Sequence, residues 1–98
     1  MLPRVLPEDQ VQIFKFWFDG SLQAGIHHCN ELYYRALTVD IHQRSRLYHL
    51  ACRLSRHRAT TLVSLTANQC SLWVSLRDHA VAVPLLPRSA VGFSHVQF

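Results

Sequence analysis

The side chains best suited to chemistry gather in residues 25–34, GIHHCNELYY, where His27, His28 and Cys29 are consecutive. Imidazole nitrogens and thiolates are preferred zinc ligands, and a cysteine beside a histidine can also act as a nucleophile. A zinc site would need more ligands, and His49 and Cys52 could supply two. Either chemistry requires a backbone that brings these side chains together.

The expected local structure does not do so. Residues 22–37 place apolar side chains at helical spacing, and neighbouring residues on a helix point about 100° apart, so His27, His28 and Cys29 cannot converge on one ion. Cys29 would lie on the apolar face and both histidines on the surface. The chain also contains no C-x2-C or H-x3-H pair, no glycine-rich phosphate loop and no G-x-S-x-G motif. We therefore expect no metal, no cofactor and no catalytic residue, and hence no enzymatic activity of the chain by itself.

Charge is distributed unevenly along the chain. Residues 1–40 carry five acidic and three basic side chains, whereas residues 41–77 contain six arginines and no acid. The formal net charge of +4 therefore comes from the middle of the sequence. Arginine suits planar, bidentate recognition of carboxylate or phosphate, so this pattern favours an anionic partner.

The length of 98 residues indicates a single domain, 1–98, with residues 1–6 and 88–98 as tails. No run approaches the roughly 20 apolar residues of a membrane-spanning helix, and the N-terminus lacks the apolar segment of a signal peptide. Three cysteines without framework spacing argue against a disulfide scaffold. These features predict a soluble, cytoplasmic protein.

The hydrophobic pattern predicts an α+β fold with about three N-terminal helices. The first would run from Pro7 to the Asp19-Gly20 break, and the second would follow the cap Ser21 through residues 22–37. The third begins near Asp40, and its stripe is the clearest in the chain: Leu47, Leu50, Ala51 and Leu54.

A small antiparallel sheet is expected after these helices. TTLVSLT (60–66) and CSLWVSLR (70–77) alternate and are rich in β-branched residues, so they predict a β-hairpin. AVAVPLL (80–86) would extend it to a three-stranded meander, in which Pro84 requires an edge position.

The third expected helix carries a cationic stripe opposite its apolar face. The members are spaced 4, 3, 4 and 3 residues apart: His42, Arg46, His49, Arg53 and Arg56. Solvated helix faces generally mix charges of both signs, because like charges four residues apart are unfavourable. The stripe therefore favours a binding surface, with an ordinary solvated face as the alternative.

Trp73 and Arg77 alternate with the apolar residues of the second expected strand and so lie on its other face. An exposed tryptophan beside arginine is typical of a protein–protein interface. The alternative is that a helix or the C-terminal tail covers Trp73.

These features support two classes of function. One is a non-catalytic accessory subunit that docks on a larger complex or on an acidic protein. The other is a nucleic-acid-binding protein, because three helices followed by a hairpin is the element order of a winged helix, with 41–57 as recognition helix and 61–77 as wing. The length of the second and third helices and the absence of a base in the loop at 67–69 weaken the second class.

The segments FKFWFDGS, CNELYYRA, RLYHLACRLSRHR and SLWVSLR, spread over about residues 13–77, resemble subunit V of the photosynthetic NADH dehydrogenase-like complex of cyanobacteria and chloroplasts. The resemblance implies a peripheral, cofactor-free accessory subunit of an oxidoreductase complex, on the cytoplasmic side of the thylakoid membrane. It also implies a place near the docking site of ferredoxin, an acidic electron donor. No individual binding residue follows from it.

Overall fold

A computed structural model of the protein describes residues 2–87. It contains six strands: β1 (Arg4–Pro7), β2 (Ile13–Phe18), β3 (Ser21–His28), β4 (Glu31–Asp40), β5 (Thr61–Leu65) and β6 (Gln69–Ser75). The α-helices are α1 (Arg44–Arg56) and α2 (His79–Ala82). Short 3-10 helices lie between them: η1 (Glu8–Gln10), η2 (Ile41–Gln43), η3 (Leu76–Asp78) and η4 (Val83–Leu85).

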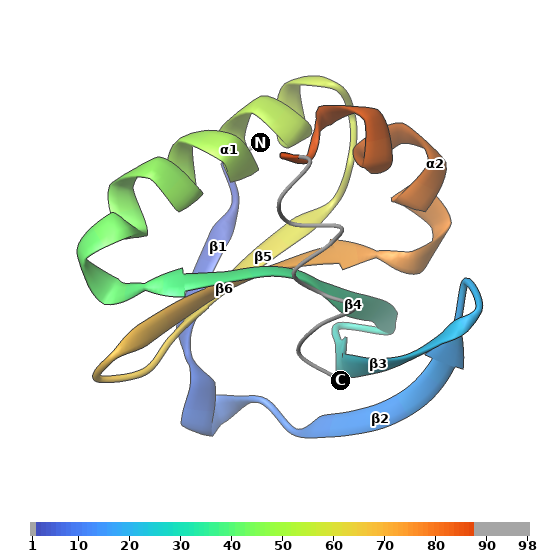
Figure 1. The fold of residues 1–98 in the computed structure, drawn as a ribbon, viewed down its shortest axis with the longest axis horizontal. Coiled ribbons are helices and arrows are strands. Elements are labelled where there is room, and N and C mark those ends of the chain that lie inside the picture. Colours follow the sequence, from blue (N-terminus) through green and yellow to red (C-terminus); the bar gives the residue numbers. More distant parts are fainter. Residues whose placement is uncertain (1, 88–98) are drawn as a thin grey trace.

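All six strands form one mixed sheet in the order β1-β5-β6-β4-β3-β2. Only β1 and β5 pair in parallel, and β2, β3 and β4 form an antiparallel meander. Since β4 and β5 flank β6 and both run antiparallel to it, the chain must cross the sheet between them, and α1 is that crossover. Both α-helices therefore cover the same face of the sheet (Figure 1).

The predicted fold class is wrong in its N-terminal half, where the two expected helices are replaced by β2, β3 and β4. The turns explain the difference. Asp19 and Gly20, and then Cys29 and Asn30, all have positive φ angles, between 51° and 81°. Two successive residues with positive φ form the tight turn whose twist matches a β-hairpin. The spacing that suggested helix stripes belongs instead to strands with apolar side chains on both faces.

The predicted and observed elements agree better in the C-terminal half of the chain. The helix over Leu47–Leu54 is present as α1, and the hairpin is present as β5 and β6. The third expected strand is wrong, because residues 80–86 form most of α2 and η4, with Pro84 inside η4. Residues 4–6 belong to β1 rather than to a tail, and the tail expected at 88–98 lies outside the described residues.

The sheet is packed on both faces. On the face under the helices, the α1 residues Leu47, Ala51 and Leu54 meet buried side chains of β4, β5 and β6. The opposite face holds a smaller apolar cluster: Ala24, Ile26, Tyr33, Leu62 and Trp73, with Leu6 and Val11 packed against it. Both faces of the central strands are therefore removed from water, which explains why β5 and β6 are buried along almost their whole length.

A polar network closes the face opposite the helices. The Arg35 guanidinium lies 4.6 Å from the centre of the Trp73 ring, and Arg35 Nη2 is 3.4 Å from Glu8 Oε1. Trp73 Nε1 donates to Ser64 Oγ at 2.9 Å, and Ser64 Oγ donates to the same Glu8 oxygen at 3.0 Å. Glu8 thus holds η1 against β4 and β5.

Leu54 is the core contact that should matter most for docking α1. The side chain has no exposed surface, so Leu54→Ala should lower the free energy of unfolding by about 2–5 kcal/mol through lost burial and a cavity. Urea denaturation followed by circular dichroism measures this. Leu2→Ala, at a leucine that is 75% exposed, is the control and should change stability by less than about 0.5 kcal/mol. Equal effects of the two variants would contradict the packing.

Candidate functional site

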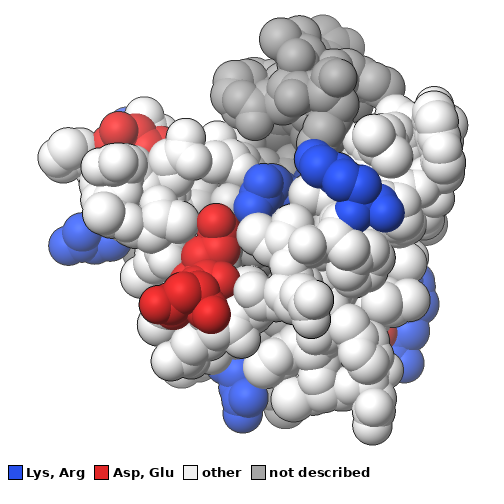
Figure 2. Space-filling view, turned by 90° about the horizontal axis from the view of Figure 1, so that it is seen from below, with Lys and Arg blue, Asp and Glu red and all other residues white. Residues whose placement is uncertain are grey.

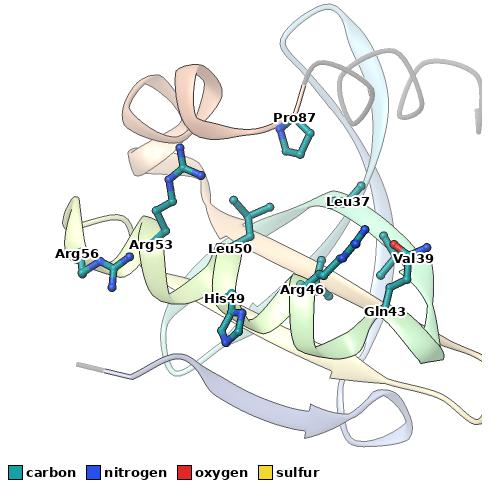
Figure 3. Close-up of a pocket in the computed structure, with 10 residues that line it drawn as sticks. Leu37, Val39, Gln43, Arg46, His49, Leu50, Arg53, Arg56 and Pro87 are labelled. Atoms are coloured by element: carbon teal, nitrogen blue, oxygen red, sulfur yellow. The ribbon is translucent and has the colours of Figure 1, made fainter.

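A groove of about 600 Å³ lies beside α1 (Figure 3). We call it the basic groove, and ten residues line it: Leu37, Val39, Gln43, Arg46, Leu47, His49, Leu50, Arg53, Arg56 and Pro87. One wall is α1, another is the second half of β4, and Pro87 follows η4. The volume falls in the range of about 300–1,000 Å³ that ligand sites in proteins occupy.

The amphipathic pattern of α1 sets the direction of the lining side chains. Because Leu47, Ala51 and Leu54 point into the core, the residues between them are turned outward or sideways. Leu50 and Arg53 point towards the side of Pro87, whereas His49 points away from it (Figure 3). The groove consequently combines a half-buried apolar floor, made by Leu37, Val39 and Leu50, with an exposed cationic rim.

The rim has no counter-charge in the described chain. No acidic residue lines the groove, and within residues 2–87 no ion pair includes Arg46, Arg53 or Arg56. Seen from the side of the molecule away from the helices, acidic side chains form a patch with basic side chains around it (Figure 2). Uncompensated guanidinium groups over an apolar floor attract anionic groups that are attached to an apolar body.

Four of the seven predicted binding residues come together in this groove: Arg46, His49, Arg53 and Arg56. The other three do not join them. His42 lies in η2, and its ring nitrogen Nδ1 is 2.6 Å from the Asp40 carboxylate. Arg77 lies in η3, where its Nε is 2.7 Å from Glu31 Oε2.

Trp73 is on the face opposite the helices, as the alternation along β6 requires, but it has no exposed surface. The expectation of an exposed hot spot is therefore wrong in this structure. Arg35 lies over the ring, Ser64 accepts its N–H, and the apolar cluster on this face surrounds it. The C-terminal tail that was the alternative cover lies outside the described residues.

The position predicted for Cys29 from the sequence pattern is also wrong. It lies exposed in the turn between β3 and β4 rather than in the core. Cys52 is half-buried and Cys70 is buried, and all three are free thiols. Among residues 2–87, no three histidine, cysteine or acidic side chains are grouped closely enough to hold a metal ion.

Six of the ten lining residues were not among the predicted binding residues, and three of them, Leu37, Val39 and Pro87, lie outside the expected third helix. Leu37 was expected on the second helix, and nothing in the sequence placed β4 beside α1. The signal that could have found them is the pair of hairpin turns at Asp19-Gly20 and Cys29-Asn30, which make residues 31–40 a strand.

The short helix α2, which precedes Pro87, is attached to the sheet by His79. The ring nitrogen Nδ1 of His79 is 2.9 Å from the Tyr34 hydroxyl, and Nε2 is 3.3 Å from Asp19 Oδ2. The His79 ring also packs edge-on against Phe18, with 4.8 Å between ring centres. These contacts tie α2 to β4 and to the turn between β2 and β3, and so position the wall at Pro87.

Burial in this cluster, and then the nearby Asp19 carboxylate, raise the pKa of Tyr34 to about 12. The folded protein therefore keeps the Tyr34 proton between about pH 10 and 12, while the unfolded chain loses it. Stability that is complete below pH 10 should fall by about 2–3 kcal/mol by pH 12. Urea denaturation across this range measures the loss, and Tyr34→Phe should remove most of its slope. An unchanged slope in Tyr34→Phe would show that another group is responsible.

The polar groups that line the groove are guanidinium, amide and imidazole groups. None of the ten lining residues carries a hydroxyl, thiol or carboxylate. No helix within residues 2–87 is long and apolar enough to cross a membrane.

Comparison with known proteins adds no information about function. No protein-family model, curated protein or solved structure matches the chain.

Proposed function

We propose that the protein is a non-catalytic docking subunit whose basic groove binds an acidic segment of a protein partner. The supporting observation is the combination, in one groove, of an apolar floor with three arginines that have no ion-pair partner among residues 2–87. Interfaces use such arginines for specificity and for fast, charge-steered association, while the apolar contact supplies affinity.

A nucleic-acid partner has less support. The winged-helix interpretation depended on three helices before the hairpin, and the structure has strands there. The turn between β5 and β6, residues 66–68, contains no basic side chain to contact phosphate. An apolar floor also contributes little to phosphate binding, in which charge dominates affinity.

The sequence resemblance suggests which assembly to examine first. Under this proposal the protein is a peripheral subunit of a photosynthetic NADH dehydrogenase-like complex, on the cytoplasmic side of the membrane. An acidic electron donor such as ferredoxin is then a partner of suitable charge for the groove. This assignment rests on the resemblance and on the cationic rim together.

Reversing two rim charges tests the docking function. The variant Arg46→Glu/Arg53→Glu should retain at least about tenfold less of the acidic proteins that the wild-type protein binds from its native cells, because attraction becomes repulsion at the groove. Affinity capture at low salt with quantitative mass spectrometry measures retention.

The matched control is Arg4→Glu/Arg58→Glu, which changes the net charge equally at exposed positions outside the groove. It should retain the partners like the wild type. Equal losses in both variants would mean that overall charge, not the groove, governs binding, and no loss in either would contradict the proposal.

Salt dependence separates the two partner classes. Binding of a fluorescent DNA duplex and a single-stranded RNA is measured by anisotropy over a range of salt concentrations. We expect weak binding that the groove variant changes no more than its control. A log–log slope of about −0.9 per phosphate contact, removed only by the groove variant, would instead favour a nucleic-acid partner.

A further inference from the structure

A second groove, of about 280 Å³, lies on the other flank of α1, between this helix and strands β1 and β5. Seven residues line it: Val5, Arg44, Ser45, Tyr48, His49, Val63 and Leu65. His49 lines both grooves. The exposed surface of α1 is therefore a ridge with a groove on either side, and His49 lies on this ridge.

The second groove repeats the chemistry of the basic groove on a smaller scale. Its floor contains the buried Val63 and the half-buried Leu65, and Val5 forms an exposed apolar edge. Arg44 and His49 supply positive or protonatable groups, and no acidic residue lines it. Both grooves consequently suit the same kind of group, an apolar side chain flanked by carboxylates.

We propose that one acidic partner segment crosses the α1 ridge and places an apolar side chain in each groove. This inference rests on the proposed docking function and specifies the partner. The occupant is a protein segment, since two apolar floors would gain nothing from a phosphate backbone.

The size of the surface supports a shared occupant. Stable protein interfaces involve about 20–30 residues on each side. The basic groove offers ten lining residues and the second groove seven, so neither reaches this size alone. Joined through His49 and the outer surface of α1, the two grooves form a continuous surface that approaches it.

The helix sets the spacing that the partner needs. An α-helix with its side chains is about 10–12 Å wide, and an extended chain advances about 3.3 Å per residue. An extended segment that crosses α1 should therefore carry its two apolar side chains three to four residues apart, with acidic residues between and beside them.

Two synthetic peptides of identical composition test this spacing. Each has seven glutamates and two phenylalanines. In one peptide the phenylalanines are four residues apart, and in the other they are adjacent. Titration of the isotope-labelled protein, followed by amide NMR shifts, should give about five- to tenfold tighter binding of the spaced peptide. The spaced peptide should also shift amides on both flanks, at Leu37 and Val39 and at Val63 and Leu65. Equal affinities, or shifts on one flank only, would overturn the inference.

A matched pair of variants gives an independent measurement. Val5→Glu places a carboxylate at the second groove and should lower the affinity for the spaced peptide to that for the adjacent one. Val81→Glu is the control, because Val81 is 44% exposed, close to the 43% of Val5, and lies outside both grooves. Thermal unfolding confirms that both variants fold.

The outcomes distinguish this inference from the proposed function. If Arg46→Glu/Arg53→Glu abolishes peptide binding while Val5→Glu has no effect, docking at the basic groove stands and the two-groove contact is wrong. If the charge reversal also has no effect, the proposed function itself fails. A single-stranded DNA of equal charge that binds as tightly as the spaced peptide would overturn the choice of a protein partner.

Discussion

The stacking of Arg35 on Trp73 is the interaction on which the architecture depends. It places a guanidinium group in a partly buried position, where burial lowers the pKa of Arg35 and the Glu8 carboxylate partly restores it. A charge in such a position requires a counter-charge, and although the buried Arg35 Nε has no hydrogen-bond partner within residues 2–87, Nη2 faces a carboxylate. Glu8 supplies the charge, and Ser64 links that carboxylate to the indole N–H. One network thereby joins β4, β5, β6 and η1.

The placement of the acidic side chains also determines where the positive charge of the molecule remains available. Among residues 2–87 the acidic side chains are largely occupied: Glu8 by Arg35, Asp19 by His79, Glu31 by Arg77 and Asp40 by His42. Asp78 accepts the backbone N–H of Thr60. The arginines of α1 receive no counter-charge from them. The basic groove therefore results as much from where the acids are held as from the number of arginines.

The sequence predicted those elements whose pattern has one interpretation. The stripe from Leu47 to Leu54 fits only a helix, and the alternation from Cys70 to Leu76 fits only a strand, so α1 and β6 could be recognised. In IFKFWF (13–18), Phe14, Phe16 and Phe18 lie on one side of the strand and Ile13 and Trp17 on the other, and so many apolar side chains on both sides resemble the pattern of a buried helix. Gly25 allows a close approach by the Phe16 ring of the neighbouring strand, whose Cε1 would lie 2.5 Å from an added Cβ.

Only the helical part of the candidate site could be predicted from the sequence, because only that part depends on local sequence pattern. A helical stripe of cations is local information, so Arg46, His49, Arg53 and Arg56 could be named without a fold. The groove is not local, because its other walls come from β4 and from Pro87, which pairing and turns place there. The burial of Trp73 likewise depends on Arg35, 38 positions away in sequence on the neighbouring strand.

The elements that form the basic groove are each held in place by separate contacts. Their order affects the entropy cost of binding a ligand. The helix α1 is fixed by its buried leucines, β4 by pairing on both sides, and α2 by the contacts of His79 with Tyr34 and Asp19. A site whose walls are already ordered loses little conformational entropy when a ligand binds. Its specificity then comes from fixed spacing: Arg46 and Arg53, seven residues apart on one helix, are held about 10 Å apart along its axis. Under the proposed docking function, this spacing of cations along an ordered helix selects partners by the separation of their carboxylates, which a mobile basic segment would not do.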